Sequence, residues 1–453
     1  MQKLFDEVAS LDKRCYEEFA LSEDILMEHA SAGMASYIRQ NFSKASTLIV
    51  VCGSGNNGAD GIALARQLHG EYDVSIYYAK PPASMMARLQ EKRAKAIGVK
   101  ECVEIKSSDI LVDAIVGTGF KGEFTQDLTT LIKKLNNSSA FKIACDMPSK
   151  GFKANLTLTM GALKKSLFLD ENKDAVGEIQ VIDLGISRNV YEGDTNWNLL
   201  DVSDLHLPIR DKKDSHKGSY GHLALACGSK SGASILSALS ALRFGTGLVT
   251  LIGFEDKQIP NSLMYTHELP ANTTALALGM GLGNGFSDKE LHKFLNNTFA
   301  LVADADVFHM PILEQILKRK NVVLTPHAKE FVALLKHTNL ANIDVEALQQ
   351  NRFKYVEMFT KSYPKITLIL KGANVIIAKD DMFFVNPHGT SALAKGGSGD
   401  VLSGLVGALL AQGYSSIDAA KNASLAHTLL AQNYKGADFS LTPEDLISEI
   451  CNL

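Results

Sequence analysis

The segment from Ala394 to Gly404, AKGGSGDVLSG, combines a glycine-rich turn with a carboxylate. Three glycines and a serine precede Asp400, and apolar residues at helical spacing follow it directly. Such a turn directs free backbone N–H groups toward one point at the positive end of a helix, where an anion is stabilised. Asp400 is then placed to act as a base on a hydroxyl that approaches a bound phosphate. The alternative is an ordinary helix with Asp400 as its N-cap.

A second glycine loop, GSGNNGADG over residues 53–61, follows an apolar strand and precedes a helical pattern. It satisfies the GxGxxG pattern of dinucleotide-binding folds, which also needs an acidic residue about 20 positions later. Here the next expected strand ends at Lys80 instead, which counts against ordinary nicotinamide redox binding. The pair Asn56 and Asn57 suits another role, because asparagine carbonyl groups coordinate cations and asparagine amides hydrogen-bond ligands.

Polar residues also follow two later strands. Asp113 lies in LVDAIVGTGFKG, and Asp146 and Ser149 lie in DMPS. The carboxyl ends of parallel strands form the ligand-binding edge of an open α/β sheet, so we expect these groups to converge with the second glycine loop, which ends near Asp60. The alternative is that each aspartate only caps the helix that follows it.

Strands and helices alternate in the first half of the chain, which predicts a doubly wound parallel sheet in a Rossmann-like α/β domain. The expected strands cover residues 47–52, 74–78, 110–116, 141–145 and 179–182. Helices are expected over residues 10–42 and from Asp60 to about Leu68.

A polar segment over residues 196–217 interrupts this alternation and contains Pro208, so it is predicted to be a linker. We therefore expect one domain over residues 1–200 and another over residues 211–453. A second α/β series follows the linker, with a meander near its end. Its expected strands cover residues 223–227, 248–252, 275–278, 301–303, 322–324, 366–370, 374–378 and 382–385, and its expected helices include 233–243, 419–432 and the helix that carries Asp400.

The 453 residues carry a formal net charge of −4, with 46% hydrophobic and 21% charged residues. These values are typical of a soluble globular protein and argue against nucleic acid as a partner. No apolar run reaches the length of a membrane span, and the charged N-terminus lacks the apolar core of a signal peptide. The six cysteines are scattered without a CxxC pair, so we expect buried free thiols, no zinc site and a reducing, cytoplasmic location.

Three motifs together, GSGNNGADG, DAIVGTGFKG and DMPS, resemble the YjeF N-terminal family of NAD(P)H-hydrate epimerases. The resemblance implies a potassium site formed by Asn57, Asp113 and Ser149. It also implies that the hydrate is bound by Asn56, Asn57, Gly58, Ala59, Asp60, Gly117, Thr118, Gly119, Phe120, Lys121, Gly122, Glu123 and Asp146. The acid and the base of epimerisation stay open between Asp113 and Asp146.

Two residues depart from the pattern of that family. Ala59 stands where glycine is usual, which would put a methyl group near the ligand. Lys150 stands where glycine usually follows the serine of DxPS, and it could shift the loop after the potassium site. Neither change removes an implied ligand.

The second half resembles the ribokinase-like family of ADP- or ATP-dependent NAD(P)H-hydrate dehydratases in KGSYGH, LRFGTGLV, GMGLG, DAD, TPHAKE, KGANVI and GGSGDVLSG. The implied fold is a ribokinase-like α/β sandwich, and Met280 replaces the usual proline of GPGLG. The implied hydrate site contains Ala233, Gly281, His327 and Asp400, and the implied nucleotide site contains Lys371, Gly372, Ala373, Asn374, Val375 and Gly399. Mg²⁺ is expected with the nucleotide, although no residue stands out as its ligand.

Together the resemblances imply a homo-oligomeric bifunctional enzyme that epimerises hydrated NADH and NADPH (NADHX and NADPHX) and dehydrates one epimer. In the implied dehydration Asp400 takes the hydroxyl proton, the oxygen attacks the terminal phosphate of ADP or ATP, and phosphate then leaves the ring. His327 is expected to orient the ligand, and the alternative is a solvated histidine at a helix start. The alternative function is a small-molecule kinase fused to a non-catalytic N-terminal binding module.

Overall fold

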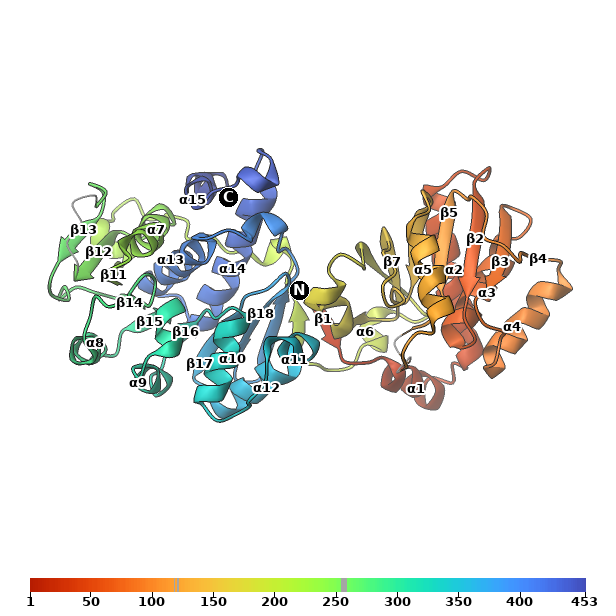
Figure 1. Ribbon diagram of the computed structural model, residues 1–453, viewed down its shortest axis with the longest axis horizontal. Helices are drawn as coiled ribbons and strands as arrows, with labels where there is room; N and C mark the ends of the chain where they lie inside the picture. Colours follow the sequence, from red (N-terminus) through yellow and green to blue (C-terminus); the bar gives the residue numbers. More distant parts are fainter. Residues whose placement is uncertain (118, 120–121, 254–258) are drawn as a thin grey trace. The chain divides into compact units, whose positions relative to one another are not determined.

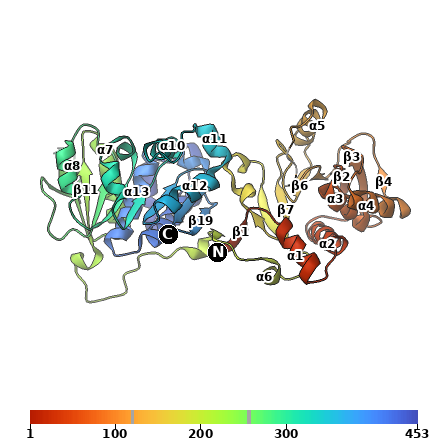
Figure 2. The same ribbon diagram turned by 90° about the horizontal axis from the view of Figure 1, so that it is seen from below.

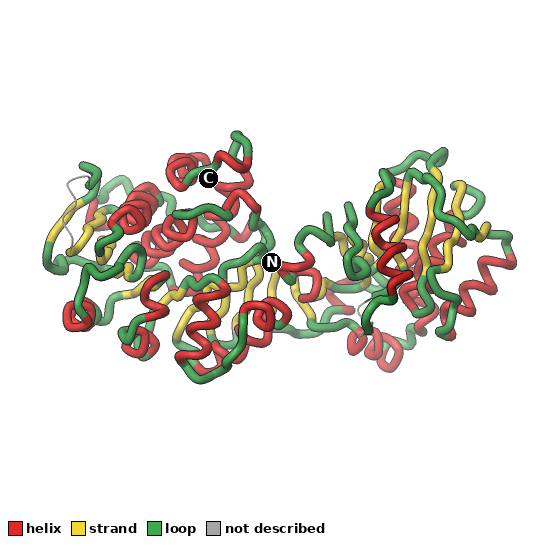
Figure 3. Tube along the Cα trace, in the orientation of Figure 1, coloured by secondary structure: helices red, strands yellow, loops and turns green. Residues whose placement is uncertain are grey.

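The structure is a computed structural model that describes residues 1–117, 119, 122–253 and 259–453 (Figure 1). The chain divides into two compact units, residues 3–195 and residues 196–453, the latter including residues 1–2. Helices and strands alternate along both units (Figure 3). None of the helices within the described ranges is long and apolar enough to span a membrane.

The first unit is built on a parallel sheet with the strand order β4-β3-β2-β5-β6-β7-β9. Its strands are β2 (Thr47–Cys52), β3 (Asp73–Tyr78), β4 (Lys100–Glu101), β5 (Ile110–Ala114), β6 (Phe141–Cys145), β7 (Leu156–Met160) and β9 (Glu178–Ile182). Its helices are α1 (Ala9–Glu18), α2 (Glu23–Asn41), α3 (Asn56–Leu68), α4 (Met85–Ala96), α5 (Gln126–Asn136) and α6 (Arg188–Tyr191).

Helices cover both faces of this sheet because its strands are apolar on both sides. Leu128, Ile132 and Leu135 of α5 pack with one face, and apolar residues of α2 and α3 pack with the other. The helices α3 and α4 lie side by side in both views (Figure 1 and Figure 2). The predicted doubly wound sheet is therefore confirmed. A short parallel pair joins β1 (Gln2–Phe5) to β8 (Leu163–Lys164).

The second unit contains a mixed sheet in which β13-β12-β11-β14-β15-β16-β17 run parallel and β18 and β19 form an antiparallel meander. Its strands are β10 (Trp197–Leu199), β11 (His222–Cys227), β12 (Leu248–Gly253), β13 (Met264–Thr266), β14 (Ala275–Leu278), β15 (Ala300–Ala303), β16 (Val322–Leu324), β17 (Ile366–Leu370), β18 (Val375–Lys379) and β19 (Met382–Asn386). The predicted meander is confirmed. Part of the predicted linker is strand instead, because β10 pairs in parallel with β19.

Helices also cover both faces of the second sheet, with α7, α13 and α14 on one side (Figure 1). The helices are α7 (Ser231–Arg243), α8 (Asp288–Phe294), α9 (Leu313–Leu317), α10 (Ala328–His337), α11 (Val345–Gln350), α12 (Arg352–Ser362), α13 (Ser398–Ala411), α14 (Ser416–Asn433) and α15 (Pro443–Glu449). Residues 401–411 of α13 are all buried, and a Cβ on Gly404 would lie 1.9 Å from Ser240 Oγ of α7. This close packing fixes the position of the helix that begins with the glycine-rich turn.

Candidate active sites

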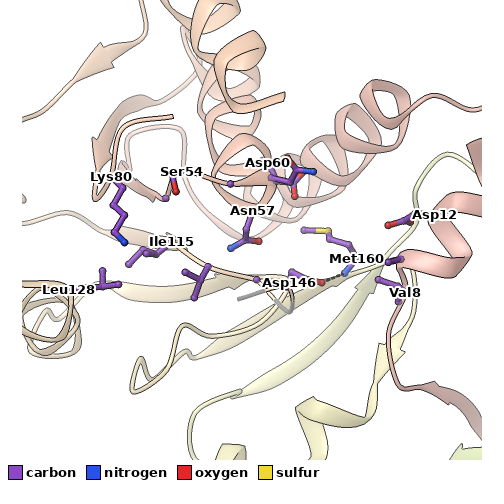
Figure 4. Close-up of a pocket in the computed structure, with 17 residues that line it drawn as sticks. Val8, Asp12, Ser54, Asn57, Asp60, Lys80, Ile115, Leu128, Asp146 and Met160 are labelled. Carbon is purple, nitrogen blue, oxygen red and sulfur yellow. Dashed lines mark hydrogen bonds between the residues drawn. The ribbon is translucent and has the colours of Figure 1, made fainter. Parts of the chain in front are cut away.

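A cavity of about 430 Å³ lies at the carboxyl edge of the sheet in the first unit (Figure 4). It is bounded by α1, by the start of α3, and by the segments that follow β5 and β6. The structure brings together in its lining six of the residues predicted from the sequence: Asn56, Asn57, Asp60, Gly117, Gly119 and Asp146.

The glycine loop reaches this cavity because two of its positions leave no room for a side chain. A Cβ on Gly53 would lie 1.8 Å from the Ile115 carbonyl oxygen, and a Cβ on Gly58 would lie 2.1 Å from the Gly53 carbonyl oxygen. Helix α3 begins at Asn56, four positions before the predicted start, and its N-cap is Gly55. Asp60 is therefore inside the helix, and it does not act as a cap.

Asp113 and Ser149 form one buried unit at the ends of β5 and β6. Ser149 donates its backbone N–H to Asp113 Oδ2 at 2.7 Å and its hydroxyl to Oδ1 at 2.8 Å. Oδ1 also accepts the Ile115 N–H at 3.1 Å. Burial raises the pKa of Asp113 to about 6, although these hydrogen bonds oppose the shift. Both carboxylate oxygens are thus occupied by protein donors.

Asn57 carries the polar group in this region that most needs a ligand. Its side-chain Oδ1 and Nδ2 are both buried, and neither has a hydrogen-bond partner within the described part of the chain. Such orphaned groups are costly unless something binds them. Gly117 lies next to this side chain, since a Cβ there would be 3.5 Å from Asn57 Oδ1.

Asp146 has an unusual backbone and a buried cation as its partner. Its φ of 68° lies in the left-handed region, which a non-glycine residue seldom adopts. The carboxylate Oδ1 accepts from the Lys164 ammonium, from the Met160 N–H at 3.2 Å and from the Thr159 hydroxyl at 3.4 Å. Lys164 was not predicted as a site residue.

Two further carboxyl groups line the same cavity. Burial and the negative charges of Asp146 and Asp12 raise the pKa of Asp60 well above its usual value. Burial also raises the pKa of Asp12, whose Oδ1 accepts the Tyr191 hydroxyl at 2.7 Å. The cavity therefore presents Asp146 together with carboxyl groups that favour the protonated form.

Several implied ligand residues do not line the cavity. Gly58 is buried outside the lining. The methyl group of Ala59 packs in an apolar cluster with Met27, Met86 and Ala87, so the expectation that it lies near the ligand is wrong. Gly122 and Glu123 are exposed outside it. Thr118, Phe120 and Lys121 lie outside the described residues.

Lys150 leaves the neighbouring buried unit intact. Its side chain is exposed, and Gly151 adopts the positive φ of 85° that the turn requires. The Phe152 N–H donates to the Ser149 carbonyl oxygen at 2.7 Å. The departure from the family pattern is thus accommodated without loss of the contacts between Ser149 and Asp113.

The glycine-rich turn of the second unit leads directly into α13. Gly397 is the N-cap, with a φ of 90°, and Asp400 is the third residue of the helix, so the N-cap alternative for Asp400 is wrong. The Ser398 N–H donates to the Lys395 carbonyl oxygen at 3.3 Å. The N–H groups of Gly399 and Asp400 have no acceptor within the first turn and are free to bind an anion.

A buried carboxylate and a lysine lie beside this helix start. Asp304 is 2% exposed, and its Oδ1 accepts from Lys371 Nζ at 2.9 Å while its Oδ2 accepts from Ser403 Oγ at 2.7 Å. A Cβ on Gly399 would lie 3.3 Å from Lys371 Nζ. Asp304 also caps the following turn through the Ala305 N–H, but its role extends beyond capping.

Asp400 lies half-buried in this charged environment. Burial raises its pKa to about 6, and the carboxylates of Asp304 and Asp306 add to the shift while Lys371 opposes it. No hydrogen bond to its carboxylate is formed by any residue that the structure describes. The group is thus free to accept a proton from a ligand.

His327 is the N-cap of α10, as in the alternative weighed from the sequence. Its Nδ1 accepts the N–H groups of Lys329 and Glu330 at 3.1 and 3.2 Å, and its Nε2 lies 3.3 Å from Glu330 Oε1. Ala233 and Gly281 lie together, because a Cβ on Gly281 would be 3.1 Å from Ala233 Cβ. These contacts are compatible with ligand binding by His327, Ala233 and Gly281.

The segment Lys371–Asn374 is held by a residue that sequence reasoning missed. Arg352 is 1% exposed and donates to the carbonyl oxygens of Asn374 at 3.0 Å and of Leu370 and Lys371 at 3.4 Å. Met280 is buried, and its carbonyl oxygen accepts the Ser234 hydroxyl at 2.7 Å, which ties the GMGLG turn to α7. The turn that has Met280 in place of the family's proline is therefore fixed by a direct contact to α7.

Comparison with known proteins yields one family for each unit. The family described as YjeF-related protein N-terminus matches residues 23–166, and the NAD(P)H-hydrate dehydratase family matches residues 223–452. A ribokinase-like superfamily protein from Enterococcus faecalis has a similar fold, with a TM-score of 0.50 and 21% identity over 58% of this chain and 96% of that one. An ADP/ATP-dependent NAD(P)H-hydrate dehydratase from Bacillus subtilis, co-crystallised with ATP and Mg²⁺, is 28% identical over 54% of this chain and 92% of that one, with a TM-score of 0.46.

One relative matches along the entire chain. The bifunctional NAD(P)H-hydrate repair enzyme Nnr of Helicobacter pylori is 43% identical over 474 residues, which cover 100% of both proteins. The two family matches lie one after the other within the length that this relative covers. The chain therefore belongs to the family of bifunctional NAD(P)H-hydrate repair enzymes.

Proposed function

We propose that this chain restores hydrated NADH and NADPH with two separate sites, an epimerase site in residues 3–195 and a dehydratase site in residues 196–453. The observation that carries the proposal is Asp400, a half-buried carboxylate to which no described residue donates a hydrogen bond, next to the free N–H groups of a helix start. A base and an anion site in one place are what phosphoryl transfer to a hydroxyl requires.

In the dehydration, Asp400 accepts the proton of the hydroxyl on the hydrated ring. The hydroxyl oxygen then attacks the terminal phosphorus of ADP or ATP, and the bond to the remaining nucleotide breaks. Charge on the transferred group is stabilised by the N–H groups of Gly399 and Asp400 and by the Lys371 ammonium. Phosphate then leaves the ring with the C–O electron pair as the ring nitrogen supplies its lone pair, which gives an iminium ion. Loss of a proton from the neighbouring ring carbon to solvent forms the ring C=C bond and regenerates the reduced nicotinamide.

The nucleotide site is proposed to contain Lys371, Gly372, Ala373, Asn374 and Val375 together with Gly399. The proximity of Lys371 Nζ to Gly399 supports this grouping, and Arg352 fixes the backbone of the segment. Mg²⁺ is proposed to enter with the nucleotide, because the described residues offer no cluster of three or more acidic, histidine or cysteine ligands for it. The hydrate is proposed to contact Ala233, Gly281, His327 and Asp400.

Potassium is proposed to bind through Asn57, Asp113 and Ser149 in the first unit. The residues fit this ion, since Asn57 Oδ1 is buried without a partner and the other two supply oxygen atoms in a buried unit. When bound, the ion would supply positive charge beside the Asp113 carboxylate. Asp113 is not proposed as acid or base, because its two oxygens already accept three hydrogen bonds.

Epimerisation is proposed to use Asp146 as base and Asp60 as acid, since both line the cavity. Asp146 accepts the hydroxyl proton, the bond between the hydroxyl-bearing carbon and the ring nitrogen breaks, and a C=O bond forms. Asp60 supplies the proton that the nitrogen takes up. After rotation of the open form, closure on the other face with the protons returned gives the opposite epimer.

A homo-oligomer and a cytoplasmic location are also proposed on the basis of the sequence resemblance. The cysteines support a reducing environment, because Cys52 and Cys145 are buried free thiols. Sedimentation of the purified chain would give its oligomeric state.

The test supplies the purified chain with mixed epimers of NADH hydrate, K⁺, Mg²⁺ and either ADP or ATP. Return of the reduced-nicotinamide absorbance is followed while the epimers are resolved by chromatography. We expect nucleotide-dependent recovery, with both epimers consumed faster than they interconvert spontaneously. Consumption of one epimer alone would contradict the epimerase site, and a stable phosphorylated product would favour the kinase alternative.

A further inference from the structure

Lys164 is a fully buried charged residue of the epimerase unit, and none of the proposed chemistry uses it. Its side chain is 0% exposed, whereas that of its partner Asp146 is 13% exposed. A buried ammonium is costly unless each of its protons finds an acceptor. Lys164 has three acceptors: Asp146 Oδ1, Thr159 Oγ1 at 2.8 Å and the Met160 carbonyl oxygen at 3.3 Å.

The hydrogen bonds to the Asp146 carboxylate all go to one of its two oxygens. Oδ1 accepts from Lys164, Met160 and Thr159, whereas Oδ2 accepts from none of the residues that the structure describes. Asp146 lines the cavity, and the dashed line in Figure 4 marks the hydrogen bond that its Oδ1 accepts from the Met160 N–H. The carboxylate is therefore held at one oxygen and available at the other.

The position of Lys164 depends on pairing with the N-terminal strand. Lys164 belongs to β8, where Phe5 of β1 is its register partner. The next residue, Lys165, is also buried, but its ammonium pairs with Asp6 at 3.0 Å, and the Asp6 side chain is 80% exposed. The two adjacent buried lysines thus have different partners: Asp146, the partner of Lys164, lines the cavity, and Asp6, the partner of Lys165, is exposed outside it.

We propose that Lys164 is a positioning residue of the epimerase, which fixes Asp146 Oδ1 so that Oδ2 faces the substrate. The inference rests on the proposed role of Asp146 as base. Without the ammonium, the carboxylate loses the charge-assisted hydrogen bond that fixes its orientation.

The titratable groups around Asp146 come from several elements. Asp12 lies on α1, Asp60 on α3 and Tyr191 on α6, while Cys145 precedes Asp146 at the end of β6. Lys80 also lines the cavity. None of these groups donates to the Asp146 carboxylate within the described part of the chain, whereas the Lys164 ammonium does.

The experiment compares Lys164→Met with Lys165→Met in the full-length chain. Epimerase activity is measured as consumption of the R epimer across a pH series, and dehydration of the S epimer by the same preparation reports the other unit. We expect Lys164→Met to lower the epimerase kcat by about 10- to 100-fold, with little change in KM. Lys165→Met should leave kcat, KM and the pH profile unchanged, because the partner of Lys165 does not line the cavity.

A double-mutant cycle separates the positioning role from a purely structural one. Asp146→Asn alone tests the base, and Asp146→Asn combined with Lys164→Met should lose no more activity than Asp146→Asn. The proposal would be overturned if Lys164→Met lowered the activity of Asp146→Asn by the same factor as it lowers that of the unchanged chain. A wild-type kcat and pH profile in Lys164→Met would also overturn it. If Asp146→Asn keeps full activity, the proposed base is wrong, which is a distinct result.

The double-mutant cycle also tests the proposal if the Lys164→Met chain does not fold. The double variant buries neither charge, so it avoids the unpaired carboxylate that makes the single change costly. Near-ultraviolet circular dichroism would establish which variants are folded. A folded double variant with the activity of Asp146→Asn supports the proposal, and one with much lower activity contradicts it.

Discussion

Asp113 in the first unit and Asp400 in the second have the same raised pKa, about 6, for the same reason, but they are built for different tasks. Asp113 is fully buried, and both of its oxygens accept hydrogen bonds from Ser149 and Ile115. Asp400 is half-buried beside a free helix terminus and accepts no hydrogen bond from the described residues. A raised pKa thus identifies a base only where an oxygen stays free for the substrate.

The two carboxylate–lysine pairs make a second contrast. In the first unit Lys164 is buried and its partner Asp146 lines the cavity. In the second unit the carboxylate of Asp304 is buried, at 3% exposure, and its partner Lys371 is 21% exposed beside Gly399. One pair therefore presents an anion to its site and the other a cation, which suits proton abstraction in the first and phosphate binding in the second.

The largest expected effect separates Asp400 from Asp113. Asp400→Asn removes the base and should lower the dehydratase kcat by about 10²- to 10⁴-fold, measured as return of the reduced-nicotinamide absorbance. Epimerase activity in the same preparation should be unchanged. Substantial dehydration by a folded Asp400→Asn chain would refute the assignment of the base.

The matched change is Asp113→Asn, which should act on the first unit alone. The new amide places N–H donors against the donors of Ser149 or Ile115, at a cost of about 1–3 kcal/mol in the free energy of unfolding. Dehydration of the S epimer should continue at the original rate. Loss of dehydration in this variant would contradict the independence of the two sites.

Much of the fold follows from local patterns, and the departures have identifiable causes. The Asn56-Asn57-Gly58 sequence has low helix propensity, so the predicted start of α3 lies too late, although these residues form its first turn. The strand β10 was missed because it is three residues long and is stabilised by distant partners: Trp197 stacks on Phe383 with ring centroids 4.5 Å apart.

Site residues were predictable where a motif carried them. Lys164 left a signal that was not used, since two lysines within the apolar run LTLTMGALKKSLF imply buried cations that need partners. Arg352 left none, because its acceptors lie at least 18 residues away along the chain, and arginine on a helix is usually exposed. Asp12 could not be distinguished from any other acidic residue on an amphipathic helix.

A pH profile would sharpen the contrast between the free carboxyl of Asp400 and the hydrogen-bonded carboxyl of Asp113. Asp400 must lose its proton to act as a base, and its pKa is raised to about 6, so the dehydratase rate should fall as the pH drops below about 6. The expected decrease approaches tenfold per pH unit, measured as kcat/KM for the S epimer on both sides of that value. An acid limb that is unchanged in the residual activity of Asp400→Asn would assign it to another group.

Removal of potassium tests whether the hydrogen-bonded carboxyl of Asp113 belongs to an ion site. Replacing K⁺ by choline should lower the free energy of unfolding of the first unit, by about 2.7 kcal/mol if the ion is present at 100 times its dissociation constant. Thermal unfolding followed with increasing K⁺ measures this effect. The dependence should be lost in Asn57→Ala, which removes the orphaned oxygen. A midpoint that is equally sensitive to K⁺ in both chains would contradict a role for Asn57.

The smallest expected effect concerns Ala59, the departure from the family pattern whose methyl group was expected near the ligand. Its methyl group is buried against Met27, Met86 and Ala87 inside α3 and does not line the cavity. Ala59→Gly should therefore cost about 1–2 kcal/mol of stability through lost burial and helix propensity, and it should leave the epimerase KM unchanged. Chemical denaturation measures the first quantity and R-epimer kinetics the second.

The neighbouring position supplies the control for this change. Gly58→Ala places a Cβ 2.1 Å from the Gly53 carbonyl oxygen, so the glycine loop must move and epimerase activity should be lost. Two adjacent residues of one motif thus have opposite requirements, because Gly58 faces the turn that opens the cavity and Ala59 faces the core. A changed KM in Ala59→Gly would place the methyl group at the ligand after all, and α3 would then be rotated relative to the packing described.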